Sequence, residues 1–163
     1  MRVALGIGAN LGQRDKNIEQ ALELLERALG RLEAKSRLIE TPAMVLAEDR
    51  AEEMPKFLNS VALFQTRLSP HEILEEARNV ERLLGRKREE EARRWQPRLI
   101  DVDILAIDQL VLSESDLQVP HAEMEKRDFV LRPFAEVWPE WIHPILKKNV
   151  AELLTELCTK REH

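Results

Sequence analysis

Two carboxylates, Asp101 and Asp103, stand two positions apart inside the otherwise apolar stretch 99–107. Side chains two residues apart on a β-strand point to the same side, with their Cα atoms about 6.6 Å apart, so both carboxylates can reach the same ions. Like charges in a partly dry place are unfavourable without a compensating cation, and we therefore predict a site for Mg²⁺. The alternative is a solvent-facing strand whose aspartates pair with arginines.

A concentration of basic residues precedes this stretch. In a chain with a formal net charge of −5, the segment 86–98 contains Arg86, Lys87, Arg88, Arg93, Arg94 and Arg98. Guanidinium groups bind phosphate oxygens through paired hydrogen bonds, while metal ions neutralise the remaining oxygens. The two features together predict a polyphosphate site. The alternative is a solvated helix extension, because the glutamates at 89–91 interrupt the basic run.

Hydrophobic periodicity predicts the elements that position these residues. The expected elements are a strand at 3–7, a helix at 15–32, strands at 34–41 and 57–66, a helix at 69–84, a strand at 99–107 with a short hairpin partner near 110–112, and helices at about 127–137 and 149–159. The second helix has the clearest start, because Ser69, Pro70 and Glu72 form a capping-box sequence, and Gly85 suits its end.

The order strand, helix, strand, strand, helix, strand is typical of helices packed on an antiparallel sheet. We therefore predict the α+β class and a ferredoxin-like βαββαβ fold with additional short C-terminal helices. The chain contains no repeat, low-complexity tract or linker, so residues 1–163 are expected to form a single domain.

Composition narrows the class of protein further. A content of 44% hydrophobic and 34% charged residues is typical of a globular chain with a solvated surface. The net negative charge argues against non-specific nucleic-acid binding, and Cys158, the only cysteine, excludes a disulfide framework. No stretch has the length of a membrane span or of a signal sequence. We expect a cytoplasmic monomer that binds small molecules, with neither a nucleic acid nor a membrane as partner.

The residues from Arg94 to Asp103 read Arg-Trp-Gln-Pro-Arg-Leu-Ile-Asp-Val-Asp. This stretch resembles the signature of the 6-hydroxymethyl-7,8-dihydropterin pyrophosphokinase family, Arg-Trp-x-Pro-Arg-x-x-Asp-x-Asp. Further matches are Gly6-x-Gly8-x-Asn10-Leu11-Gly12, Thr41-Pro42, Phe57-Leu58-Asn59, Glu81 with Gly85-Arg86, Val119-Pro120-His121 and Arg127-x-Phe129. This ordered series covers most of the chain, and the family has the ferredoxin-like fold predicted above.

The resemblance implies that ATP donates its β,γ-pyrophosphoryl group to the hydroxymethyl group of a reduced pterin, leaving AMP. Asp101 and Asp103 would then hold two Mg²⁺ ions, and Arg86 and Arg98 would neutralise phosphate charge during transfer. The residues that the resemblance assigns to ATP are Glu81, Arg86, Arg88, Arg98, Ile104, His121 and Arg127. Among them, His121 and Arg127 would bind phosphates, the Ile104 backbone would contact adenine, and Glu81 would lie beside the nucleotide.

The pterin site implied by the resemblance contains Thr41, Pro42, Phe57, Asn59, Trp95 and Phe129. The Asn59 amide offers a donor and an acceptor that match the ring edge, and the two phenylalanines would stack on the ring faces. Core packing is the alternative for the phenylalanines, and anchoring of its own segment is the alternative for Trp95. The chain departs from the family pattern at the glutamates 89–91, where many relatives have a shorter and more basic connection that closes over the site. It also departs at Asp116 and Gln118, where relatives often supply nucleotide contacts, and at Ala122, where an aromatic residue is common.

Two other classes of protein share parts of this pattern. Gly6, Gly8 and Gly12 follow a strand and precede a helix, as in a dinucleotide-binding fold, but Gly12 lies four residues after Gly8 instead of three. A non-enzymatic ferredoxin-like module that binds nucleotide or RNA is the second alternative. RNA-binding sheets display aromatic residues on their central strands, whereas this chain has only 4% aromatic residues.

Overall fold

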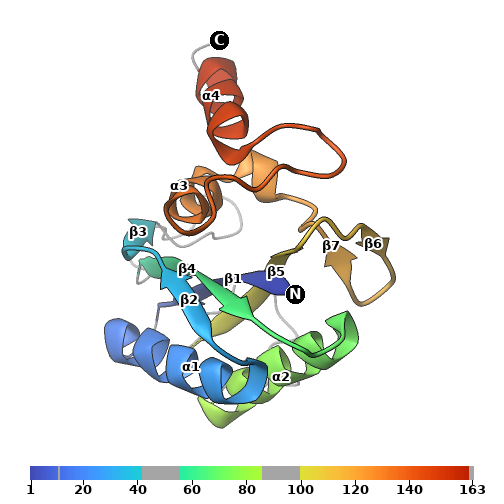
Figure 1. Ribbon diagram of the computed structural model, residues 1–163. Coiled ribbons are helices and arrows are strands. Elements are labelled where there is room, and N and C mark those ends of the chain that lie inside the picture. The colour runs from blue at the N-terminus through green and yellow to red at the C-terminus, as the bar shows by residue number, and fades with distance from the viewer. Residues whose placement is uncertain (11, 42–55, 86–99, 162–163) are drawn as a thin grey trace.

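The structure is a computed structural model that describes residues 1–10, 12–41, 56–85 and 100–161 (Figure 1). Within these residues an antiparallel sheet carries helices on both faces, so the predicted α+β, ferredoxin-like fold is confirmed. The strands of the main sheet lie in the order β2-β4-β1-β5, and β3 pairs with β4. Their bounds are β1 Arg2–Ala9, β2 Leu32–Lys35, β3 Ile39–Thr41, β4 Phe57–Gln65 and β5 Asp101–Ile107.

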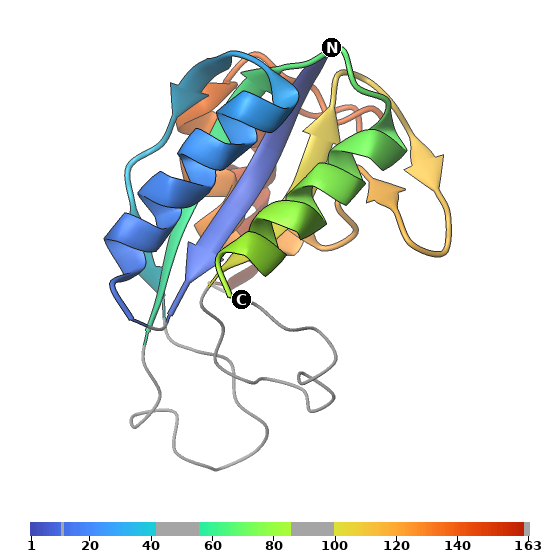
Figure 2. The same ribbon diagram turned by 90° about the horizontal axis from the view of Figure 1, so that it is seen from below.

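Two helices, α1 (Arg14–Leu29) and α2 (Pro70–Leu83), cover one face of the sheet (Figure 2). Alternate residues of β1, such as Leu5 and Ile7, are buried in one core together with Leu25 of α1 and Ile73 of α2. Alternation along a strand sends the intervening small residues of β1 to the opposite face. This face therefore has room for other groups to approach the backbone of the central strand.

The predicted start and end of α2 are both confirmed. Ser69 Oγ accepts the backbone N–H of Glu72 at 3.3 Å, and Glu72 Oε1 accepts the backbone N–H of Ser69 at 3.0 Å. These hydrogen bonds lower the pKa of Glu72, with the Ser69 backbone as the largest cause. Gly85 follows the helix with φ 95°, a conformation that glycine adopts without steric strain.

The opposite face of the sheet carries α3 (Asp128–Val137), and α4 (Val150–Arg161) lies farther from the sheet (Figure 1). A single-turn 3₁₀ helix, η2 (Met124–Lys126), precedes α3. A second hydrophobic core lies between this face of the sheet and the helices α3 and α4. Phe134, Trp138 and Trp141 form an aromatic cluster in this core, and the ring centroids of Phe134 and Trp138, which stack, are 6.1 Å apart. Trp141 Nε1 donates to Asp108 O at 2.8 Å, which fixes the segment after α3 to the end of β5.

Three predicted boundaries were wrong. The first helix was expected to reach residue 32, but it ends at Leu29 because Gly30 adopts φ 137° and the chain turns into β2. The strand expected at 34–41 is interrupted after Lys35. There, Ser36 N–H donates to Val61 O and Ser36 Oγ accepts Val61 N–H, so the serine side chain replaces part of the regular ladder. The chain then resumes pairing with β4 as β3.

The expected hairpin partner of β5 near 110–112 was the third error. The strand at this position, β6 (Leu112–Ser113), pairs with β7 (Gln118–Val119) and not with β5. The outer edge of β5 is partly occupied, because Leu105 O accepts the backbone N–H of His121 at 2.9 Å. The segment after β7 therefore takes the place of the predicted partner beside β5.

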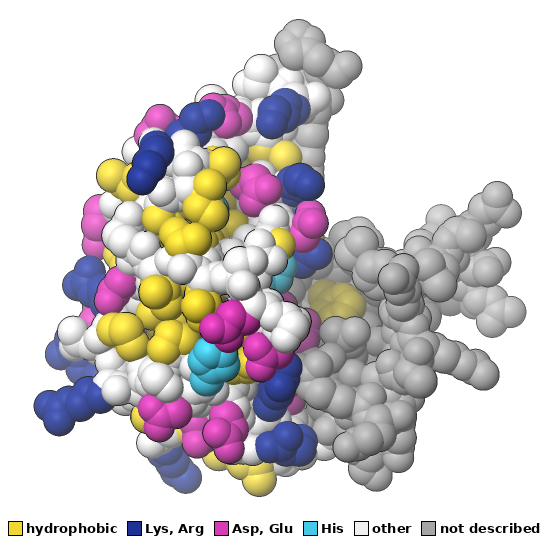
Figure 3. Space-filling model, turned by 90° about the vertical axis from the view of Figure 1, so that its right-hand side faces the viewer, with side chains coloured by type: hydrophobic (Ala, Val, Ile, Leu, Met, Phe, Trp, Pro, Cys, Tyr) yellow, Lys and Arg dark blue, Asp and Glu magenta, His cyan; other side chains and the backbone are white. Residues whose placement is uncertain are grey.

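The surface is mixed in polarity. On the face shown in Figure 3, acidic and basic side chains are interspersed, with hydrophobic side chains between them. Across the described ranges, no helix combines the length and the apolar composition needed to cross a lipid bilayer. The described residues on this face thus form no continuous basic surface of the kind that binds phosphate backbones non-specifically.

His143 closes the loop between α3 and α4. Its Nδ1 accepts the backbone N–H groups of Ile145 and Leu146, each at 3.2 Å, and its ring meets Trp141 edge-on. The side chain is buried, and this burial lowers its pKa, while Glu125 partly opposes the effect. Protonation of Nδ1 would remove both accepted hydrogen bonds, so the fold requires the neutral ring.

We predict that the free energy of unfolding falls as the pH drops below about 6.5. As the pH falls through this value, the unfolded chain binds a proton at His143 more fully than the native protein does, because burial lowers the native pKa. One such group contributes a slope of at most about 1.4 kcal/mol per pH unit. Urea unfolding between pH 7.5 and 5 measures this slope. The variant His143→Asn keeps an acceptor oxygen but cannot titrate, so its slope should be smaller. An unchanged slope in this variant would contradict the prediction.

Candidate active site

A cavity of about 850 Å³ lies on the side of the sheet that faces α3. Residues of four strands, of α3 and of the segment after β7 line this cavity. The residues that line it are Gly6, Ile7, Gly8, Asn10, Ile39, Glu40, Thr41, Phe57, Asn59, Ser60, Val61, Asp101, Asp103, Leu105, His121, Arg127, Asp128, Phe129, Val130 and Arg132. Its size suits drug-sized ligands, and its lining mixes apolar walls with a few polar groups.

The floor of the cavity is formed by two glycines of the central strand. Gly6 pairs with Asp103 of β5, and Gly8 lies between Asp101 of β5 and Asn59 of β4 in the register of the sheet. A Cβ atom added at Gly8 would lie 3.0 Å from Asn59 Oδ1, which is closer than ordinary van der Waals contact. Glycine at this position therefore keeps open the space between the carboxylates and the amide.

The two aspartates occupy one wall of the cavity. Asp101 and Asp103 are both half-buried and both line the cavity, while Val102 between them belongs to the core on the α1 and α2 side. The structure thus places the two carboxylates on the same side of β5, as the spacing predicted. Both carboxylates also interact with other protein groups. Two neighbouring carboxylates at the edge of a polar cavity are a suitable ligand set for a hard divalent cation.

Glu81 is buried between α2 and β5. Its side chain is 1% exposed, and Glu81 Oε2 accepts the backbone N–H of Val102 at 3.0 Å. Glu81 follows Ala77 by four residues, so the helical repeat turns it toward the sheet with the buried stripe of α2. It is absent from the described residues that line the cavity, and its hydrogen bond to the Val102 N–H places it at the outer edge of β5. The place beside the nucleotide that the resemblance implies stays a prediction.

Ile104 is also buried, and it lies on β5, which is the last strand in the order of the sheet. Its side chain belongs to the core on the α1 and α2 side. The Val102 N–H points away from β1 toward Glu81, and backbone groups two residues apart on a strand point the same way. The backbone of Ile104 is therefore directed toward the outer edge of β5, where another molecule could meet it.

The opposite wall of the cavity carries an amide and two aromatic rings. Asn59 Nδ2 donates to Thr41 Oγ1 at 2.8 Å, which orients the amide across the pair β3 and β4. Phe57 and Phe129 come from β4 and α3, are both half-buried, and both line the cavity. The structure therefore brings together Thr41, Phe57, Asn59 and Phe129, which are four of the six residues predicted for the heterocycle.

His121 and Arg127 approach the cavity from the segment that joins β7 to α3. His121 Nδ1 accepts the backbone N–H of Glu123 at 3.2 Å, so the neutral ring carries its proton on Nε2. Burial lowers the pKa of His121, and Arg127 lowers it further, although Glu123 and Asp101 oppose this effect. The Arg127 guanidinium lies 5.9 Å from the centre of the Phe129 ring. His121 therefore provides a hydrogen-bond donor, and Arg127 provides a fixed positive charge, on the same side of the cavity.

Several predicted site residues lie outside the described ranges. These residues are Pro42, Arg86, Arg88, Trp95 and Arg98. Their assignment depends on the sequence alone.

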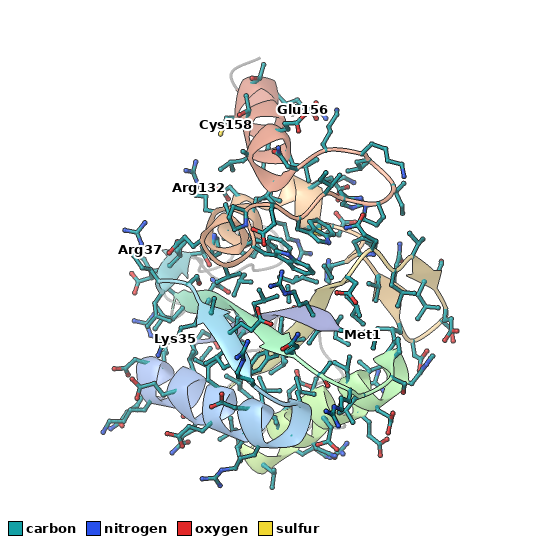
Figure 4. The ribbon with its side chains drawn as sticks, in the orientation of Figure 1. Met1, Lys35, Arg37, Arg132, Glu156 and Cys158 are labelled. Atoms are coloured by element: carbon teal, nitrogen blue, oxygen red, sulfur yellow. The ribbon has the colours of Figure 1, made fainter. Side chains whose placement is uncertain are left out.

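The cavity also contains polar residues to which the sequence analysis assigned no role, although Asn10 belongs to the matched series at the start of the chain. Asn10 is 2% exposed, Glu40 stands beside Thr41 on β3, and Asp128 and Arg132 form an ion pair at 3.8 Å on α3. Arg132 also approaches Cys158 of α4 (Figure 4), with 3.9 Å between Nη2 and Sγ. Asn10 had a local signal, because a polar residue directly follows an apolar strand. Glu40, Asp128 and Arg132 had no such signal in the sequence, since charged residues are common on exposed helix and strand faces.

Together, the fold and the cavity define an α+β protein of the ferredoxin-like class with a binding site of small-molecule size. The family model described as 7,8-dihydro-6-hydroxymethylpterin-pyrophosphokinase (HPPK) matches residues 4–139, and the chain belongs to this family. A 2-amino-4-hydroxy-6-hydroxymethyldihydropteridine pyrophosphokinase of Aquifex aeolicus is 40% identical over 158 residues, covering 97% of this chain and 93% of the relative. The Methylorubrum extorquens protein of the same name is 37% identical over 157 residues, covering 96% and 93%.

Solved structures show the same fold. A Plasmodium falciparum HPPK-DHPS structure with pterin has a TM-score of 0.73 at 15% identity, and the match covers 99% of this chain and 45% of that chain. The wild-type HPPK-DHPS of the same organism with pteroate has a TM-score of 0.74 at 14% identity, covering 98% and 42%. This chain therefore spans less than half the length of these two structural neighbours.

Family membership confirms the resemblance seen in the sequence. The chain is a pyrophosphokinase of folate biosynthesis, a transferase that acts on small molecules with ATP as co-substrate. The dinucleotide-binding alternative was wrong, because the sheet is antiparallel and not doubly wound. The alternative of a non-enzymatic RNA-binding module was also wrong, since the matched relatives are enzymes by name.

Proposed function

We propose that the chain transfers the β,γ-pyrophosphoryl group of ATP to 6-hydroxymethyl-7,8-dihydropterin and requires Mg²⁺. In this reaction the hydroxymethyl oxygen forms a bond to the β-phosphorus and releases its proton to water. The bond from that phosphorus to the α,β-bridging oxygen breaks, and AMP leaves with that oxygen. The observation that carries the proposal is the juxtaposition, in one cavity, of the carboxylates Asp101 and Asp103 with the amide and rings of Asn59, Phe57 and Phe129.

Asp101 and Asp103 would hold two Mg²⁺ ions. The donor set fits these ions, because it is made of carboxylate oxygens that are half-buried on one cavity wall. When bound, Mg²⁺ supplies positive charge that offsets the charge on the phosphate oxygens and orients them. Glu81 would act through the backbone, since its hydrogen bond to Val102 N–H fixes the strand residue between the two aspartates.

The residues on the other walls would bind and orient the two substrates. Asn59 would recognise the pterin edge, with Thr41 holding its amide, while Phe57 and Phe129 would enclose the ring faces. His121 would donate from Nε2 to a phosphate oxygen, and Arg127 would add a fixed charge. The Ile104 backbone, directed to the outer edge of β5, would contact adenine.

Sequence alone supports the remaining assignments. We propose that Arg86, Arg88 and Arg98 bind the phosphates, and that Pro42 and Trp95 complete the pterin site. We also propose that residues 1–163 form one domain that acts as a cytoplasmic monomer, with neither a nucleic acid nor a membrane as partner. Size-exclusion chromatography with light scattering tests the monomer.

The proposed reaction predicts a specific product. Incubation of the protein with Mg²⁺, ATP and 6-hydroxymethyl-7,8-dihydropterin should yield AMP and not ADP, as measured by ion-exchange chromatography. Excess EDTA should reduce AMP formation at least about 100-fold, because metal ions provide several kcal/mol of charge stabilisation in phosphoryl transfer. The control substrate is 6-methyl-7,8-dihydropterin, which lacks the acceptor oxygen. Formation of ADP, or equal AMP formation with the control substrate, would refute the proposal.

A further inference from the structure

Arg14, the first residue of α1, joins three elements at the edge of the cavity. Its Nη1 donates to the backbone carbonyl of Lys56 at 2.7 Å, and its Nη2 donates to Glu40 Oε2 at 2.9 Å. Glu40 lies on β3 and lines the cavity, while Lys56 directly precedes β4. One guanidinium group therefore connects the start of α1 to both strands that carry Thr41 and Asn59.

The strand that Arg14 holds is short. β3 has three residues, and its register pairs Thr41 with Phe57 and Ile39 with Asn59. Three residues provide few ladder hydrogen bonds, so a charge-assisted contact to the middle residue, Glu40, adds a substantial constraint. The planar fork of arginine can donate to two acceptors at fixed angles, which the single ammonium group of lysine cannot reproduce.

The contact of Arg14 with Glu40 also constrains the side-chain amide of Asn59 in the cavity. Thr41 follows Glu40 directly, and Thr41 Oγ1 accepts Asn59 Nδ2–H at 2.8 Å. The other end of the amide, Asn59 Oδ1, lies above Gly8, as shown by the 3.0 Å separation from a Cβ placed there. A displacement of β3 would therefore release the amide from the orientation in which it faces the cavity floor.

We propose that Arg14 is a positioning residue for the heterocyclic substrate, because it holds β3 against β4 and thereby orients Asn59 through Thr41. The inference rests on the proposed function, in which this wall of the cavity binds the pterin. Arg14 does not line the cavity within the described residues, so its effect on the pterin passes through Glu40 and Thr41. The nucleotide, held at the opposite wall, should be much less sensitive to Arg14.

A purely structural role predicts a different outcome. The ion pair of Arg14 with Glu40 is partly exposed, with 30% and 45% of the two side chains accessible, and exposed pairs stabilise folds only slightly. Loss of Arg14 should thus leave the melting temperature almost unchanged while the pterin affinity falls. A structural role alone would lower the affinities for both substrates together.

The test uses the full chain and calorimetry with 6-hydroxymethyl-7,8-dihydropterin, in the presence of Mg²⁺ and a non-hydrolysable ATP analogue. Arg14→Met, which keeps the aliphatic stem, should raise the pterin Kd about 10-fold and change the Kd of the analogue less than about 2-fold. The matched control is Arg27→Met, an exposed arginine of the same helix, which should change neither Kd. Arg14→Lys should recover only part of the affinity.

A double-mutant comparison identifies the route of the effect. In a Thr41→Val background, Arg14→Met should cause less than about a 2-fold further loss, because the contact through which it acts is already absent. A full additional 10-fold loss there, or an unchanged pterin Kd in Arg14→Met alone, would overturn the positioning role. Equal loss of both ligands would overturn it as well. Absence of pterin binding by the unchanged protein would instead refute the proposed function on which it rests.

Discussion

Replacing Asp101 with asparagine should lower kcat for AMP formation about 1,000-fold or more, which corresponds to about 4 kcal/mol of transition-state stabilisation. Asparagine preserves the size of the side chain and one oxygen but removes the negative charge that attracts a divalent ion. Asp103→Asn should have an effect of the same order, because both carboxylates line the same wall of the cavity. Initial rates at saturating ATP and pterin provide the measurement.

The fold should survive both substitutions. Asp101 and Asp103 are half-buried and belong to neither hydrophobic core, and removing one of two neighbouring like charges relieves repulsion in the absence of metal. The melting temperature without Mg²⁺ should therefore be unchanged or slightly higher. Addition of Mg²⁺ and ATP should raise the melting temperature of the unchanged protein more than that of either variant.

The matched control is Asp108→Asn, at the residue that directly follows the other end of β5. Asp108 is exposed, and its Oδ1 accepts the backbone N–H of Arg2 at 3.0 Å, a contact that asparagine can keep. Its φ of 44° is also tolerated by asparagine. This variant should turn over at the rate of the unchanged protein. Normal turnover by Asp101→Asn at millimolar Mg²⁺ would remove the carboxylate from the proposed metal site.

The sequence predicted the fold well where the signals were local. The spacing of apolar residues gave the central strands and the main helices, and Ser69 with Glu72 fixed the start of α2. The errors lie where tertiary contacts decide. Ser36 interrupts a predicted strand because its hydroxyl finds the Val61 N–H, a partner 25 residues away, and no local pattern reveals that contact.

The same distinction applies to the candidate site. Asp101 and Asp103 could be found because two residues on one strand share a face whatever the rest of the fold does. Arg14 could not, since its partners Glu40 and Lys56 lie 26 and 42 residues away in the chain. Glu81 was recognised as a member of a motif, but its contact with the Val102 N–H at the outer edge of β5 follows from the rotational phase of α2 relative to the sheet.

The glycines of β1 illustrate how a local pattern can be correct while its reason stays hidden. Alternation of apolar and small residues predicted a strand that another group approaches closely. In the structure, the groups near Gly8 are the side chains of Asn59 and Phe57, and Asp101 is the residue of β5 that pairs with Gly8. Glycine is needed at position 8 because a side chain would enter the space beside Asn59, and not because the chain turns there.

Gly8→Val should therefore raise the pterin Kd about 100-fold, or about 2.7 kcal/mol, while changing the Kd of a non-hydrolysable ATP analogue less than about 3-fold. The first added carbon would already lie 3.0 Å from Asn59 Oδ1 and 3.6 Å from Phe57, so the two γ-methyl groups of valine must enter the cavity or displace the amide. Gly8 has no left-handed φ, and valine favours strands, so the backbone should accept the substitution. Calorimetry in the presence of Mg²⁺ measures both constants.

Gly6→Ala separates the effect of cavity volume from that of a generally disturbed strand. A Cβ at Gly6 would make ordinary contacts of 3.5 Å with Leu105, so this variant should bind pterin within about 5-fold of the unchanged protein. Gly8→Ala should fall between Gly6→Ala and Gly8→Val, because a methyl group crowds Asn59 without filling the space beside it. If Gly8→Val bound pterin normally, the heterocycle could not occupy the floor between Asn59 and Asp101. If both glycine variants lost pterin and nucleotide equally, a distorted sheet would explain the result and the pocket assignment would fail.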